Sequence, residues 1–269
     1  MQRVRIAFAS VVRRVRGLRV FAVMGLAASG VVLTATPAQA DVRPFVFSYE
    51  ATTMPAGGFE YEQWVTWKAS KSTDSDFDRL DFRHELEWGV TDHFQLAFYA
   101  DWRYEDGQSV SDDGESFQDL AIEAIYNLTD PVEDPLGIAL YGEYKGGDEK
   151  QVIETKLLLQ KNIGKWILVW NGSFEAEWEG KHYDEDKMVL EQTAGLAYQI
   201  SPNVSVGAEL LHEIEYEDWE QWGDHTVYLG PNASYRGDGW WITVAPLFQV
   251  TDIDSEADFQ TRMIFGIIF

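Results

Sequence analysis

Apolar and polar residues alternate along most of the chain with a period of two. In residues 80–88, apolar or aromatic side chains at the even positions alternate with charged side chains at the odd positions, and residues 94–105 continue a similar pattern. Successive side chains of a β-strand point to opposite faces, so this pattern predicts strands with one apolar face and one charged face. No helical period and no second domain interrupt it.

Twelve segments carry the pattern: 58–69, 79–89, 93–105, 117–128, 136–145, 151–161, 165–178, 188–200, 203–216, 225–236, 240–249 and 258–269. Most are longer than the roughly 5–6 residues usual in globular proteins, and they match the roughly 9–11 residues of a strand that crosses a bilayer. Short connections alternate with longer, acidic ones. We therefore predict an all-β fold, a single closed antiparallel transmembrane barrel of about twelve strands. Its short turns would be periplasmic, its acidic loops extracellular, and both termini would lie on the side of the short turns.

The alternation alone does not say which face meets water. Bulky aromatic residues crowd the apolar face, and several fall near strand ends, as the interfacial girdles of membrane barrels do. We therefore expect the apolar face to meet lipid. The alternative is a secreted soluble barrel or sandwich with the apolar face inside.

If the apolar face meets lipid, the charged residues line the lumen, where acids outnumber bases by 17 to 7. Such a surplus predicts a pore that favours cations. The alternative is a lumen filled by salt bridges. The predicted pore-lining residues are Asp81, Arg83, Glu85, Glu87, Asp101, Arg103, Glu123, Glu143, Glu154, Glu175, Glu177, Glu191, Glu209, Glu213, Glu215 and Arg262.

Charge divides the chain near position 40. Residues 1–40 hold six arginines and no acid, whereas the remainder holds 15 Lys and Arg against 45 Asp and Glu. A basic stretch, an apolar run and the small residues Ala38 and Ala40 predict a secretory signal peptide that is cleaved after Ala40. A retained membrane anchor is the alternative. We expect residues 41–57 to form an irregular periplasmic lead-in and residues 58–269 to form the barrel.

Four stretches resemble a broad family of small Gram-negative outer-membrane barrels, the transporters of the phenol-degradation (MetA-pathway-like) group. They are EWGVTDHFQLAFYADW (87–102), SFQDLAIEAIYNL (116–128), YLGPNASYR (228–236) and RMIFGIIF (262–269). The second departs from the family's Gly-Asp-Leu strand, because Gln118 stands at the glycine. The closing residues Phe265, Ile267 and Phe269 resemble the C-terminal sorting signal of outer-membrane proteins. The resemblance implies an outer-membrane location, contact with lipid and lipopolysaccharide, and insertion by the barrel-assembly machinery through the last strand.

The leading functional prediction is a passive channel or transporter for small cationic or neutral solutes. A structural or adhesive barrel with a plugged lumen is the alternative, and a lipid-modifying barrel enzyme is the third. The sequence shows no serine flanked as a barrel lipase requires, so we expect no enzyme. We also expect no cofactor and no metal. The acidity of the chain argues against nucleic acid as a partner, because phosphate contacts need Lys and Arg.

Overall fold

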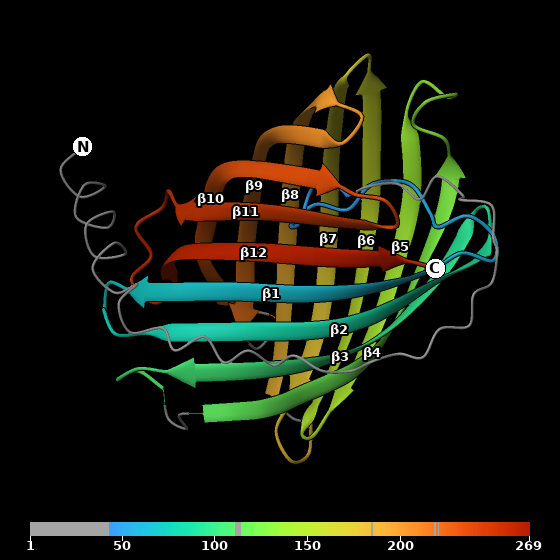
Figure 1. Ribbon diagram of the computed structural model, residues 1–269. Coiled ribbons are helices and arrows are strands. Elements are labelled where there is room, and N and C mark those ends of the chain that lie inside the picture. Colours follow the sequence, from blue (N-terminus) through green and yellow to red (C-terminus); the bar gives the residue numbers. More distant parts are fainter. Residues whose placement is uncertain (1–42, 111–113, 184, 218, 220) are drawn as a thin grey trace. The chain divides into compact units, whose positions relative to one another are not determined.

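The computed structural model describes residues 43–110, 114–183, 185–217, 219 and 221–269 (Figure 1). The predicted signal peptide and its cleavage residues, Ala38 and Ala40, lie outside the described residues. Twelve strands make up the fold: β1 (Phe59–Lys71), β2 (Asp78–Thr91), β3 (Phe94–Asp106), β4 (Gly114–Thr129), β5 (Gly137–Gly147), β6 (Lys150–Ile163), β7 (Trp166–Glu179), β8 (Glu185–Ser201), β9 (Val204–Glu217), β10 (Gln221–Arg236), β11 (Trp240–Gln249) and β12 (Ala257–Ile268).

Each strand pairs antiparallel with its neighbours in sequence, and β1 pairs with β12, so the sheet closes into a barrel. In the closing register, Glu60 lies opposite Ile268 and Ala69 lies opposite Phe259. The fold prediction is confirmed. No helix in the described parts of the chain has the length and apolarity to cross a membrane.

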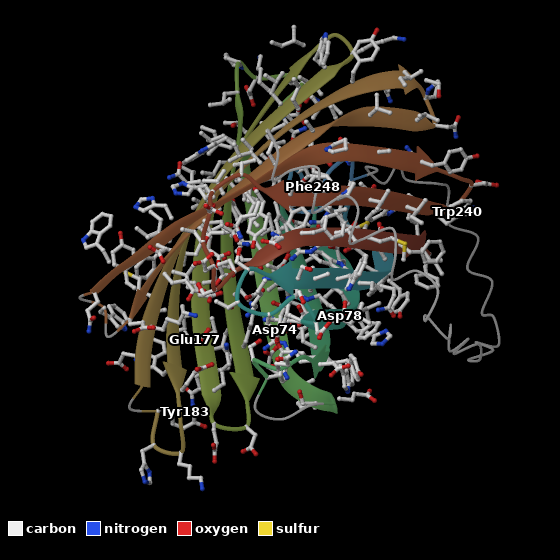
Figure 2. The ribbon with its side chains drawn as sticks, turned by 90° about the vertical axis from the view of Figure 1, so that its left-hand side faces the viewer. Asp74, Asp78, Glu177, Tyr183, Trp240 and Phe248 are labelled. Atoms are coloured by element: carbon white, nitrogen blue, oxygen red, sulfur yellow. The ribbon has the colours of Figure 1, made fainter. Side chains whose placement is uncertain are left out.

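Both ends of the barrel sheet lie with the short turns. The Phe269 amide donates to the Phe59 carbonyl at 2.9 Å, and the Gly57 amide donates to the Gly89 carbonyl, beside the β2–β3 turn, at 2.7 Å. Figure 2 shows Trp240, at the start of β11, and Tyr183, in the β7–β8 connection, at opposite ends of the barrel. We call these ends the short-turn end and the long-loop end.

The apolar face points outward and the charged face inward. Phe98 is 48% exposed, whereas the neighbouring-strand residues Glu85 and Glu123 are each 1% exposed. Such a surface inverts the arrangement of a soluble barrel, and it is the pattern of a barrel surrounded by lipid. The structure therefore agrees with the outward apolar face expected from the sequence.

Two acidic connections are shorter than expected. Residues 179–187 and 217–224 were predicted as loops, but β7 continues to Glu179 and β10 begins at Gln221. Aromatic pairing accounts for the longer β9–β10 ladder, because Tyr216 lies opposite Trp222 with their ring centroids 5.0 Å apart. Cross-strand aromatic pairs stabilise such ladders.

The segment before β1 differs most from expectation. Residues 43–58 have an irregular backbone, as predicted, but they do not form a lead-in outside the barrel (Figure 1, blue). Phe45, Val46, Phe47 and Ala51 are almost fully buried, and several residues of the segment pack in one cluster with inward-facing side chains of the strands. We call residues 43–58 the luminal segment.

Candidate functional site

The predicted pore-lining residues fall into two groups. Seven are buried, namely Glu85, Glu87, Glu123, Glu143, Glu154, Glu177 and Glu209. Nine are partly exposed, namely Asp81, Arg83, Asp101, Arg103, Glu175, Glu191, Glu213, Glu215 and Arg262. The strands bring twelve of them, together with the luminal segment, around two adjoining spaces inside the barrel, and Glu85 and Glu123 are buried in the wall outside both linings. Glu215 lies instead beside a separate space, and Glu209 binds the luminal segment directly.

Ion pairs cross the inner wall between neighbouring strands. Asp81 accepts from Arg79 and Arg103, each at 2.8 Å, and Arg83 pairs with Asp101 at 3.0 Å. The barrel register causes this, because Asp81 lies directly opposite Arg103 and Arg83 directly opposite Asp101. Opposite charges at facing positions stabilise adjacent strands.

A second set of ion pairs lies on the other strands. Lys145 contacts Glu143 at 2.8 Å, Lys156 contacts Glu154 at 3.1 Å, and Lys150 contacts Glu177 at 2.7 Å. Tyr99 and Tyr141 both donate hydroxyl hydrogen bonds to Glu143. Many charges of the lumen are therefore paired, as the salt-bridged alternative predicted.

The network surrounds a cavity of about 290 Å³, which we call the vestibule. Eight Lys or Arg residues and nine Asp or Glu residues line it, so its charges nearly balance. Phe47 and Tyr49 of the luminal segment also line it. The segment therefore forms part of the wall of this space.

The luminal segment is held by Glu209 of β9. The backbone amides of Val46, Phe47 and Ser48 donate to its carboxylate, at 3.0, 2.7 and 3.0 Å for their shortest bonds. Asn232 donates to the same carboxylate at 3.1 Å. A carboxylate that accepts several N–H groups makes strong, charge-assisted hydrogen bonds. Glu209 is thus an anchor for the segment and not a free pore charge.

Amide side chains from other strands bind the rest of the segment. Asn171, Gln160 and Gln95 accept from the backbone amides of Tyr49, Ala51 and Met54 at 2.6, 2.8 and 2.7 Å. Asn127 donates to the Ala51 carbonyl, and Asn232 donates to the Pro44 carbonyl at 3.0 Å. We call these five inward-facing residues, Gln95, Asn127, Gln160, Asn171 and Asn232, the amide belt. The belt satisfies backbone groups that would otherwise be buried without partners.

Arg43 supplies the counter-charge for two of three clustered, buried carboxylates, and the third, Glu85, lies 3.8 Å from Arg83. Glu62, Glu85 and Glu87 place one oxygen each within 4.8 Å of one another. The Arg43 guanidinium lies 3.2 Å from Glu62 and 3.9 Å from Glu87, and it stacks over the Tyr49 ring at 4.5 Å. The guanidinium of Arg43 therefore partly neutralises this cluster of carboxylates.

Sequence reasoning missed the segment and the belt. It considered only the charges of the inner face, whereas neutral amide side chains also bind the segment. One signal was available: an amide residue stands at an inward position near the short-turn end of β3, β4, β6, β7 and β10. The histidines lie elsewhere, since His212 and His225 are outward-facing and place ring nitrogens 3.1 Å apart.

Comparisons with known proteins agree on the fold. A model of a family of unknown function (DUF6662) matches residues 37–262. No curated protein matches the sequence. The COG4313 outer membrane channel from Pseudomonas putida F1 superposes with a TM-score of 0.62 at 14% identity, over 81% of this chain and 98% of that one.

Two further solved structures are similar. The NanC porin gives a TM-score of 0.51 at 9% identity, over 78% of this chain and 98% of that one. The β domain of the Bordetella autotransporter BrkA gives a TM-score of 0.51 at 12% identity, over 79% of this chain and 99% of that one. At these identities the likeness shows a shared barrel fold. The finer resemblance to the MetA-pathway-like transporters stays a prediction.

Proposed function

The chain belongs to the DUF6662 family of unknown function, and we propose that it is a channel for small solutes in a Gram-negative outer membrane. The observation that carries the proposal is the inverted barrel: an apolar outer face, a charged inner face and a vestibule of about 290 Å³ between the strands. The barrel folds of an outer-membrane channel and a porin support it. A lumen lined by charged and polar side chains suits polar solutes.

The luminal segment is the constriction of this channel. It crosses the lumen between β9 on one side and β3 and β4 on the other, because its residues bond to Glu209, Gln95 and Asn127. A solute that enters the vestibule meets the rings of Phe47 and Tyr49. Full conductance therefore requires the segment to move, and the seated segment gives a low-conductance state.

We further propose that the conducting pore prefers cations. The vestibule itself is nearly balanced, but buried carboxylates lie beside the segment, among them Glu62, Glu85 and Glu87. In a pore surrounded by low-dielectric lipid such a surplus focuses its field along the aqueous path.

The test is conductance of the refolded protein in a planar bilayer, with the reversal potential measured across a KCl gradient. Discrete conductance steps and a potential of the sign for cation selectivity support the proposal. Anion selectivity contradicts the cation preference, and high salt should weaken the preference, because the Debye length falls to about 3 Å at 1 M.

A structural or adhesive barrel is the second candidate, and the seated luminal segment favours it. A variant that lacks residues 43–56 separates the two. If the intact protein and this variant, both folded, fail to conduct, the structural barrel is the better account. If only the variant conducts strongly, the segment is a gate of a channel.

The proposed location in the outer membrane rests on the predicted signal peptide and on the last residues of the sequence. We propose cleavage after Ala40, and we propose that the barrel-assembly machinery recognises Phe265 and Ile267 on β12 together with Phe269, the residue after it. N-terminal sequencing of protein from the outer-membrane fraction checks the first. Protein that begins at Met1 in that fraction refutes it. We also propose contact with lipid and lipopolysaccharide, and the outward-facing aromatic residues support this proposal.

A further inference from the structure

Charge is unevenly distributed around the vestibule. The lining residues from β12, β1, β2 and β3 include five bases and two acids: Lys68, Arg79, Arg83, Arg103 and Arg262, with Asp81 and Asp101. The lining residues from β7, β8 and β9 include four acids: Glu175, Glu177, Glu191 and Glu213. Among the described lining residues these three strands contribute no Lys or Arg. The strands between them, β4 to β6, contribute three of each sign.

The two unbalanced sides face each other. The strands follow one another around a closed ring of twelve, so the group β12–β3 lies across the lumen from the group β7–β9. The vestibule thus has a basic wall and an acidic wall, with balanced walls between them. A cavity with walls of opposite sign has an electric field across its width.

Four of the five lining charges without an ion partner in the described parts of the chain lie on these two walls, and the fifth is the buried Asp119 of β4. Lys68 and Arg262, on the basic wall, have no carboxylate within 4.0 Å in the described parts of the chain; Arg262 donates to the Thr66 hydroxyl and the Val46 carbonyl. Glu191 and Glu213, on the acidic wall, have no Lys, Arg or His partner within that distance among the described residues. All four are partly exposed within the lumen, so they are available to a solute.

We propose that the vestibule binds a small zwitterion, with its anionic group toward Lys68 and Arg262 and its cationic group toward Glu191 and Glu213. The inference deepens the proposed channel function by naming its solute class. A volume of about 290 Å³ is near the lower end for small-molecule sites, which suits a solute of amino-acid size. A solute with both charges is attracted electrostatically by both walls, whereas an anion or a cation is attracted by one wall and repelled by the other.

Isothermal titration calorimetry on the folded protein in neutral detergent at low salt tests the inference without conduction. The probes are 4-aminobutanoate, butanoate and butylamine, which share a chain length and differ in charge. We expect 4-aminobutanoate to bind and each singly charged probe to bind about fivefold more weakly, which is the upper end for the loss of one ion pair with access to water. Equal binding of a singly charged probe overturns the proposal.

Three variants locate the site. Glu191→Gln with Glu213→Gln should weaken 4-aminobutanoate binding and relieve the repulsion of butanoate, and Lys68→Gln should weaken 4-aminobutanoate and relieve the repulsion of butylamine. Glu133→Gln, in the exposed β4–β5 turn, neutralises one carboxylate outside the lumen and should leave all three affinities unchanged.

The outcomes separate this inference from the channel function. Uniform weakening of all three probes in the wall variants indicates loss of structure or of general binding and rejects the two-wall account. Conductance without binding of 4-aminobutanoate overturns the zwitterion site alone. Binding without conductance in the intact and truncated proteins overturns the channel and leaves the site standing.

Discussion

Neutralising Glu209 should release the luminal segment. Its two oxygens together accept the amides of Val46, Phe47 and Ser48 and the Asn232 side chain. Glu209→Gln keeps one accepting oxygen and replaces the other with a donor. With that oxygen in the position of Oε2, two of the five hydrogen bonds that the carboxylate accepts are lost, and each bond to a charged group contributes about 1.5–3 kcal/mol. The seated state should therefore lose about 3–6 kcal/mol, which raises the displaced population by about a hundredfold or more.

A single thiol reports the displacement. The chain has no cysteine, and Ser48 is 1% exposed with a hydroxyl that bonds to no described atom, so Ser48→Cys adds one shielded thiol. Its maleimide labelling rate should rise at least about tenfold when Glu209→Gln is added, given the loss in seating free energy. Glu133→Gln in the same background is the control with an equal change of charge. An unchanged labelling rate in a barrel that stays folded would refute the anchoring role of Glu209.

Three other measurements check the remaining reasoning. Phe98→Arg should impair refolding into lipid vesicles far more than Asp101→Asn, because a charge facing mid-membrane costs about 2–4 kcal/mol; similar yields would mean that the outward face is wrongly assigned. Glu213→Gln with Glu215→Gln should reduce cation selectivity while the barrel still folds, and a reversal potential equal to that of the parent contradicts this. Hydrogen bonds from the Ser109 and Asp76 amides lower the pKa of Asp74. The contact that Asp74 makes between the β1–β2 and β3–β4 connections is therefore fully present above the ordinary carboxyl pKa. It is lost as the pH falls through the lowered pKa. The protection factor of the Ser109 amide in hydrogen exchange should fall as this contact is lost, and Asp74→Asn should remove the pH dependence of that protection factor.

The sequence was sufficient for the barrel because the barrel depends on local alternation. The alternation within each strand distinguishes its inward from its outward residues, so the faces of Phe98 and Glu85 could be assigned without knowledge of the neighbouring strands. Strand ends were less predictable where cross-strand aromatic pairs such as Tyr216 and Trp222 extend a ladder.

The luminal segment could not be predicted in the same way. Its backbone has no period, and its contacts join residues far apart in the sequence, such as Phe47 and Glu209, which are 162 positions apart. Glu209 itself has the sequence signature of any other inward-facing acid. Whether an inward carboxylate faces a passing solute or a buried backbone depends on what fills the lumen, and strand alternation contains no information on that.

The position of the segment also explains why so acidic a lumen is compatible with folding. Near the short-turn end the inward carboxylates have partners that lie in the segment or bond beside it: Arg43 for Glu62 and Glu87, and backbone amides for Glu209. Buried carboxylates without such partners would be costly. When the segment leaves, Arg43 and those amides leave with it, and the same carboxylates then face the aqueous path. Gating and cation preference are therefore linked through one set of residues, and the open state should be the more cation-selective of the two.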